Sequence, residues 1–268
     1  MTHSLLYPWE PSAVVFKRES GISPFVFLCD HSGRRIPARL NDLDMSQDDL
    51  KRHIAWDIGI EGVGRELSSH FDACLIMQPY SRLVIDCNRR PGSETSILAV
   101  SDSTRIPGNQ LLSADDVAMR VREIFDPYHR KISSHLDGRR DAGRPTILVS
   151  LHSFTPVYAD IPRPWHAGVL YNRNPDVSLA MFQLLDAERD IVVGNNEPYS
   201  VTDETDYSIP VHGEQRGLPH LTLEIRQDLI ANKAGQTTWA ARLARLLPQA
   251  VKKSANVPPP NVRFCGRY

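Results

Sequence analysis

The chain has 268 residues, of which 41% are hydrophobic and 24% are charged, and its formal net charge at pH 7 is −1. This composition is typical of a globular enzyme core and excludes a disordered or fibrous chain. Because the net charge is close to zero, no general field attracts nucleic acid or an anionic membrane. Any anionic ligand must therefore be held by a few local arginines.

The expected location is the cytoplasm. The N-terminal segment MTHSLLYPWEPSAV has no basic region followed by an apolar run, so no signal peptide is predicted. No stretch reaches the ~18–20 apolar residues that span a bilayer. The four cysteines, Cys29, Cys74, Cys87 and Cys265, form no CxxC pair and are expected to be reduced. We expect neither a membrane nor a nucleic acid as a partner.

Predicted strands and helices alternate along the chain. Apolar runs predict strands over 24–29, 73–77, 83–85, 146–151, 168–171, 191–193 and 221–225. Helical patterns predict a region that begins at Ser46 and continues over 54–71, a helix from the N-cap Ser113 to about Leu136, and helices over 176–188 and 236–251.

This alternation predicts an α/β fold with three α/β/α layers and a mostly parallel sheet. Without an internal repeat or a low-complexity linker, the chain is expected to form one domain over 1–268. Its core would span about 24–251, and the Pro-rich tail around 258–260 would be loosely attached.

Polar residues gather where the predicted strands end. The groups are Asp30-His31-Ser32-Gly33, then Ser81-Arg82 with Asp86-Cys87-Asn88-Arg89, then His152-Ser153, and Glu224 in Leu223-Glu-Ile-Arg226. In sheets of this class, ligands bind beyond the carboxyl ends of the strands. We therefore expect these groups to meet in one site.

The residue types in these groups suit metal-assisted hydrolysis. A catalytic zinc takes about three ligands from His, Asp or Glu and keeps one position open for water, whose pKa it lowers to about 7. A carboxylate beside the metal can move protons between water and the leaving nitrogen. One arginine can stabilise the oxyanion, and a second can bind a substrate carboxylate through its planar fork.

Several motifs resemble the zinc carboxypeptidase superfamily, and its N-formylglutamate amidohydrolase branch most closely. The superfamily-like segments are Ser150-Leu-His-Ser-Phe154, Asp86-Cys-Asn-Arg89 and Leu223-Glu-Ile-Arg226, and they occur in the superfamily's order. The segments that match the branch are His31-Ser-Gly-Arg-Arg-Ile-Pro37, His53-Ile-Ala-Trp-Asp57, Asn196-Glu-Pro-Tyr199 and Gly217-Leu-Pro219. The resemblance covers roughly residues 24–232 and implies a carboxypeptidase-like mixed sheet that binds one zinc ion per chain.

The resemblance implies that His31 and His152 are zinc ligands. The carboxypeptidases place a glutamate three residues after the first histidine, and Arg34 occupies that position here. Because an arginine cannot bind a cation, the third ligand must come from elsewhere. Asp57 is the preferred candidate and His53 is its rival, since residues four apart on a helix share one face.

The resemblance also assigns the remaining roles. Glu224 would be the general base, Asn88 and Arg89 would hold the substrate carboxylate, and Arg82 would polarise the scissile carbonyl. The implied reaction is hydrolysis of the amide bond of a small N-acyl amino acid, with N-formylglutamate or a relative as the expected substrate. The alternatives are an amidase or carboxypeptidase acting on another N-acyl amino acid or a short peptide, and a non-catalytic protein that binds a carboxylated metabolite. The sequence does not indicate an oligomeric state.

Overall fold

Within residues 4–255, which the computed structural model describes, seven strands form one mixed sheet. The strands are β1 (Val15–Lys17), β2 (Phe25–Cys29), β3 (Cys74–Met77), β6 (Ile147–Phe154), β9 (Ala167–Leu170), β10 (Val193–Asn195) and β11 (His220–Arg226). Their order across the sheet is β1-β3-β2-β6-β11-β9-β10. The central strands β3, β2, β6 and β11 are parallel, whereas β1 is antiparallel to β3, and β9 is antiparallel to β11.

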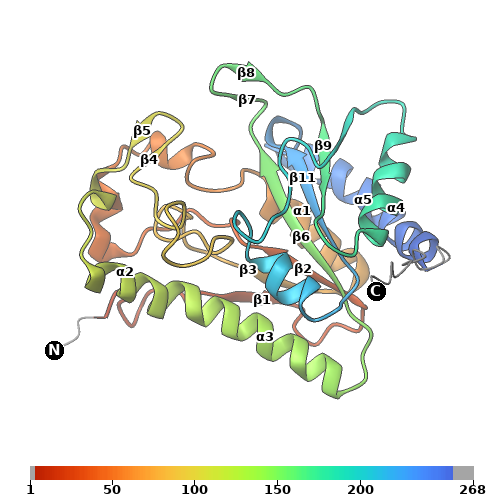
Figure 1. Ribbon diagram of the computed structural model, residues 1–268, viewed down its shortest axis with the longest axis horizontal. Coiled ribbons are helices and arrows are strands. Elements are labelled where there is room, and N and C mark those ends of the chain that lie inside the picture. The colour runs from red at the N-terminus through yellow and green to blue at the C-terminus, as the bar shows by residue number, and fades with distance from the viewer. Residues whose placement is uncertain (1–3, 256–268) are drawn as a thin grey trace, which may run out of the picture.

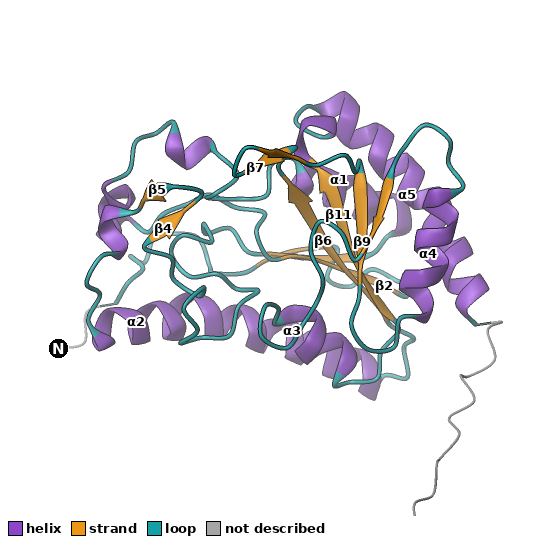
Figure 2. Ribbon diagram, turned by 45° about the horizontal axis from the view of Figure 1, so that its top comes forward, coloured by secondary structure: helices purple, strands orange, loops and turns teal. Residues whose placement is uncertain are grey.

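Helices cover both faces of this sheet (Figures 1 and 2). One face carries α1 (Ile60–Phe71), α4 (Asp176–Asp186) and α5 (Lys233–Ser254). The opposite face carries α3 (Asp126–Asp141), which continues α2 (Ala114–Arg120) through the π-helical turn Val121–Phe125. The predicted α/β/α layering with a mostly parallel mixed sheet is therefore confirmed.

Shorter elements complete the chain between these layers. Two hairpins lie outside the main sheet: β4 with β5 (Val100–Ser101 and Thr104–Arg105) and β7 with β8 (Val157–Tyr158 and Ile161–Pro162). The remaining turns are the 3-10 segments Ala38–Asp44, Asp49–Lys51, Pro107–Asn109 and Gln227–Leu229 and the π-helical segment Ile209–Glu214.

The alternation of side chains along β6 and β11 makes the two faces of the sheet chemically different. Odd-numbered residues over 147–151 and 221–225 belong to the apolar core that α1, α4 and α5 cover. Even-numbered residues point to the opposite face, where His152, Thr222 and Glu224 line one cavity. The period of two therefore places the polar residues of neighbouring strands side by side.

Two of the predicted segments are not formed as expected. Residues 83–85 form no strand: they begin within a turn in which Val84 N donates to Ser81 O over 2.9 Å, and their apolar side chains pack as buried loop residues. Between Ser46 and Gly59 the only helical piece is a 3-10 turn, and α1 begins at Ile60. Gly59 has a φ of 83°, a left-handed conformation that does not belong to a right-handed helix.

The other predicted strands and helices are present, with ends that shift by a few residues. Ser113 begins α2 with the predicted cap, since its hydroxyl accepts from Asp116 N over 3.1 Å. Cys29, Cys74 and Cys87 are buried free thiols, while Cys265 and the Pro-rich tail lie outside the described residues. Between residues 4 and 255, no helix combines the length and the apolar character needed to cross a membrane.

Gly33, in the turn after β2, offers a test of how tightly this turn packs. A Cβ atom on Gly33 would lie 1.9 Å from the carbonyl oxygen of Pro79, so the backbone would have to move. We expect Gly33→Ala to lower the free energy of unfolding by about 1–3 kcal/mol in a urea titration. The control is Gly138→Ala in α3, where a Cβ meets no atom within 4 Å, and a gain of about 0.5–1 kcal/mol is expected. Equal effects of the two substitutions would contradict the close packing.

Candidate metal centre

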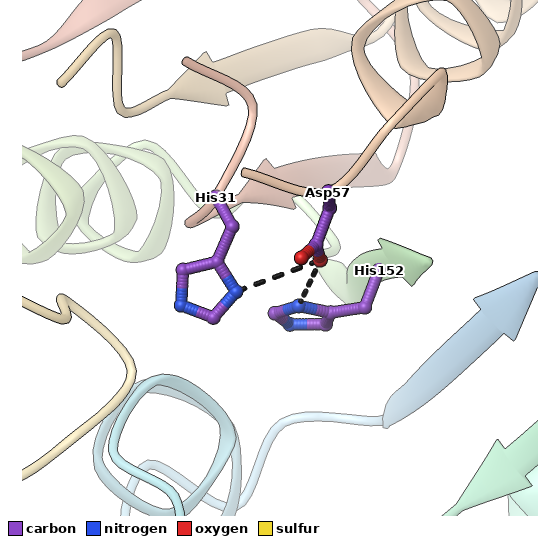
Figure 3. A group of neighbouring side chains, drawn as sticks. All are labelled: His31, Asp57 and His152. Atoms are coloured by element: carbon purple, nitrogen blue, oxygen red, sulfur yellow. Dashed lines mark hydrogen bonds and ion pairs between the residues drawn. The ribbon is translucent and has the colours of Figure 1, made fainter. Parts of the chain in front are cut away.

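His31, Asp57 and His152 converge at the carboxyl end of the parallel strands (Figure 3). One ligand atom from each residue lies within 4.8 Å of the others, and all three side chains are buried. We call these residues the metal-binding group. The structure thus brings together the two predicted histidines and the preferred third ligand.

Each member of the group is fixed by a different element. His31 lies in the turn after β2, and His152 lies near the end of β6. Asp57 precedes α1, where its backbone N donates to His31 O over 2.9 Å. The Oδ2 atom of Asp57 accepts from Ser153 N over 3.2 Å. Hydrogen bonds therefore hold Asp57 to the backbone at His31 and beside His152.

The outer nitrogen of each imidazole faces a further carboxylate. His31 Nε2 lies 2.7 Å from Asp86 Oδ1, which places a proton on that nitrogen. His152 Nε2 lies 3.5 Å from Asp30 Oδ2 and 3.0 Å from the Ser150 hydroxyl, which favours the same tautomer. Histidines that ligate metals are commonly oriented by carboxylates in this way.

The Nδ1 nitrogens of both rings face one carboxylate oxygen. Asp57 Oδ2 lies 3.0 Å from His152 Nδ1 and 3.5 Å from His31 Nδ1, and the latter nitrogen has no hydrogen-bond partner. When the rings are neutral in these tautomers, their Nδ1 lone pairs point at this carboxylate and repel it unless a cation lies between them. The residues therefore fit a metal ion, and two nitrogens with one oxygen match the ligand set of a hydrolytic zinc.

The buried carboxylates favour positive charge at the two imidazoles. Burial alone would raise the pKa of Asp57, but His31 and His152 hold that pKa well below its usual value. Burial and Arg82 lower the pKa of His31, yet Asp86 and Asp57 raise it above its usual value overall. The buried carboxylates thus draw positive charge onto the imidazoles.

Glu224 lies beside His152, because the two residues are register partners on the parallel strands β11 and β6. Its side chain lines the cavity, and its Oε2 atom is buried without a hydrogen-bond partner. Burial raises the pKa of Glu224 to about 7, with His152 opposing the rise and Asp57 adding to it. A carboxyl group with a pKa near neutrality can both accept and return a proton.

Arg82 follows β3 and lies at the edge of the metal-binding group. Its Nε and Nη2 atoms donate to Asp86 Oδ2 over 3.0 and 2.6 Å. Its Nη1 atom lies 3.6 Å from Asp57 Oδ1. Although burial opposes the shift, Asp86 and Asp57 raise the pKa of Arg82, so the guanidinium stays charged.

Asn88 and Arg89 line the same cavity on the side of β3. The amide oxygen of Asn88 accepts from Tyr207 N over 3.0 Å and from Ser208 N over 2.9 Å, and its nitrogen donates to Asp206 over 2.9 Å. One amide hydrogen of Asn88 is left for a ligand. Arg89 donates to the Asn88 carbonyl oxygen over 3.0 Å.

His53 also lines the cavity but does not belong to the metal-binding group. Its Nε2 atom lies 3.6 Å from Asp102 Oδ2. The expectation that His53 and Asp57 share a helical face was wrong, because the helix begins only at Ile60. The geometry therefore favours Asp57 as the third ligand.

The residues that support the site have no role that the sequence alone predicts. Asp30 and Asp86 each stand in a motif that was singled out, but only the structure shows which imidazole each carboxylate faces. Tyr128, on α3, donates to Asp30 over 2.8 Å. The only sequence signal for Asp30 was its place directly before His31 at a strand end.

Comparison with known proteins identifies relatives of this chain. The family model for N-formylglutamate amidohydrolase matches residues 23–231. The crystal structure of gene product Atu2144 from Agrobacterium tumefaciens matches with a TM-score of 0.90 at 33% identity, covering 92% of this chain and 98% of that one. The structure of N-formylglutamate amidohydrolase from Ralstonia eutropha JMP134 matches with a TM-score of 0.71 at 18% identity, covering 92% of this chain and 100% of that one. None of the curated proteins matches the chain.

The identity of the third ligand can be tested by metal analysis. We expect about one zinc per chain in the zinc-supplied protein and none in the His31→Ala/His152→Ala double variant. Asp57→Ala should lose most of the metal, because it removes the oxygen that both imidazoles face. His53→Ala is the control and should keep the metal. Elemental analysis by mass spectrometry checks this, and loss in the His53 variant alone would make His53 the ligand.

The raised pKa of Glu224 predicts a pH-dependent effect on stability in the metal-free protein. Because the folded pKa, about 7, lies above the usual value of 4.5, folding favours the protonated form. The wild type therefore loses stability as the pH rises from about 4.5 to 7, whereas Glu224→Gln does not titrate. We expect the variant to gain up to about 3 kcal/mol relative to wild type between pH 5 and pH 8. Urea unfolding at both pH values measures this, and a gap that does not widen would contradict the shift.

Proposed function

Since the chain belongs to the N-formylglutamate amidohydrolase family, we propose that it hydrolyses the amide bond of a small N-acyl amino acid, N-formylglutamate or a relative. The observation that carries the proposal is the metal-binding group with Glu224 beside it on the next strand. Zinc, one ion per chain, is the proposed metal. The closest competing reading, cleavage of another N-acyl amino acid or a short peptide, uses the same residues.

A metal ion held by His31, Asp57 and His152 would lower the pKa of a water molecule to about 7. Glu224 would accept a proton from the attacking water molecule as the water oxygen bonds to the carbonyl carbon of the amide. When the C–N bond breaks, Glu224 returns the proton to the leaving nitrogen. The products are a carboxylate, formate if the acyl group is formyl, and a free amine.

Arg82 and Arg89 take the two remaining roles, stabilisation of the oxyanion and binding of the substrate carboxylate. Nε and Nη2 of Arg82 donate to Asp86, so the remaining nitrogen, Nη1, can donate to the oxyanion. Arg89 lies farther along the chain from β3 and binds the substrate carboxylate, with the remaining amide hydrogen of Asn88 beside it. This contact orients the amide toward Glu224.

A non-catalytic protein that only binds a carboxylated metabolite is the other class of function. Such a protein has no use for a buried carboxyl group whose pKa lies near neutrality. Keeping Glu224 in this state costs folding free energy, because its carboxyl group is buried without a full set of hydrogen bonds. Glu224 therefore favours the hydrolase.

The role of Glu224 can be separated from metal binding. We expect Glu224→Gln to keep the metal content of the wild type and to lose turnover of the N-acyl amino acid that the wild type hydrolyses fastest by at least about 10²–10⁴-fold, because the amide cannot take the proton. The control Glu66→Gln alters a surface ion pair with Lys233 and should keep both properties. Release of the free amine, followed by mass spectrometry, is the readout. Near-normal turnover in Glu224→Gln would remove this residue from the mechanism.

A further inference from the structure

The cavity around the metal-binding group extends along the sheet in two directions. Its volume is about 450 Å³, within the range of sites that enclose drug-sized ligands. Toward β3 its wall is polar and includes Asn88, Arg89 and Asp206. Toward the ends of β6 and β9 its lining includes Phe154, Tyr158, Leu170 and Tyr199, which we call the apolar wall. Polar residues of the same segments, Thr155, Ser200 and Thr222, line the cavity as well.

The apolar wall begins beside the reacting residues and extends away from them. Leu170 of β9 is the register partner of Thr222 on β11, two residues from Glu224. Phe154 ends β6, and Tyr158 belongs to the β7–β8 hairpin, which projects past the end of β6 in Figure 1. A formyl group carries only a hydrogen on its carbonyl carbon and is too small to cover the four side chains of this wall.

The aromatic rings of the wall are held in place by Arg163. Its guanidinium carbon lies 4.8 Å from the ring centre of Tyr158 and 4.7 Å from that of Tyr199. One of its nitrogens donates to the Tyr199 hydroxyl over 2.7 Å. Arg163 is not among the residues that line the cavity. Stacking of this kind fixes the rings before a ligand arrives.

The charges of the cavity suit one substrate carboxylate better than two. Among the described residues that line it, the arginines are Arg82 and Arg89. Arg82 is already paired with Asp86 through two hydrogen bonds. N-Formylglutamate carries two carboxylates, so one of them would have to rely on Arg89 and the other on no arginine of the cavity. Asp206, beside Asn88, adds a negative charge to the polar wall.

We propose that the apolar wall binds an apolar group of aromatic size, so that the substrates are N-acyl amino acids with one carboxylate and one such group. This inference rests on the proposed function. With the carboxylate on Arg89 and the amide beside Glu224, the apolar group occupies the opposite end of the cavity. Either the acyl chain or the side chain of the amino acid can carry this group, and the chemistry of recognition is the same.

Four compounds test the proposal and separate its two sources. N-Formylglycine has no apolar group, N-formylglutamate has a second carboxylate, N-phenylacetylglycine has a phenyl group on the acyl side, and N-formylphenylalanine has one on the side chain. We expect at least one phenyl compound to bind Glu224→Gln about tenfold or more tightly than both other compounds, measured by calorimetry on the zinc-loaded variant. The same compound should give the highest kcat/KM with the zinc-loaded wild type.

The outcomes separate this inference from the proposed function. If N-formylglutamate has both the lowest Kd and the highest kcat/KM, the apolar subsite is overturned and the hydrolase stands. If the wild type hydrolyses none of the four compounds, the hydrolase is overturned, and the order of Kd values still decides whether the wall binds an apolar group.

A pair of matched variants locates the binding surface. Tyr158→Ser removes a ring of the apolar wall and should reduce the preference for the phenyl compound over N-formylglycine by about fivefold or more. The control is Tyr171→Ser, because the Tyr171 hydroxyl donates to Asn195 and its ring does not line the cavity. Metal content verifies that both variants are folded. An unchanged preference in Tyr158→Ser would overturn the assignment of the wall.

Discussion

The Oδ2 atom of Asp57 lies between the Nδ1 atoms of His31 and His152, with all three side chains almost fully buried. A carboxylate in this position is costly unless positive charge and hydrogen bonds surround it. The neighbouring structure supplies both, through the backbone N of Ser153 and through Arg82 at 3.6 Å. The arrangement around the site follows from the need to stabilise this one buried charge.

Two further buried carboxylates surround the same group of residues. Asp86 faces His31 from the loop after β3, and Asp30 faces His152 from the end of β2. Each carboxylate fixes the orientation of a ring and also adds negative charge to the interior. The buried surplus of negative charge then favours a divalent cation over a neutral ligand. Burial, with Asp57 adding to its effect, raises the pKa of Glu224 toward neutrality.

Much of the fold and of the site could be predicted because the signals are local. The period of two along β6 and β11 already places His152 and Glu224 on the face opposite the apolar core. The rule that strand ends converge then brings His31 to the same place. The family resemblance, which covers the segment that the family model matches, added the assignment of roles.

The parts that could not be predicted depend on contacts between distant segments. The apolar run at 83–85 has the composition of a strand, but burial in a loop satisfies the same side chains. The choice between His53 and Asp57 turned on where the loop before α1 places them: Asp57 Oδ2 faces both imidazoles, whereas His53 Nε2 faces Asp102. The hydrogen bond between Asn88 and the backbone of Tyr207 could not be predicted from any periodicity of the sequence, because 119 positions separate the two residues.

The separate origin of the apolar wall has a consequence for how such a protein can diverge. The metal-binding group comes from strand ends and the segment before α1, whereas two of the four residues of the apolar wall, Tyr158 and Tyr199, come from a hairpin and a loop outside the main sheet. Surface loops accept insertions and substitutions more readily than strands. A lineage that keeps the sheet can therefore alter its substrate range by remodelling the β7–β8 hairpin and the loop of Tyr199, while Phe154 and Leu170 stay in place on their strands.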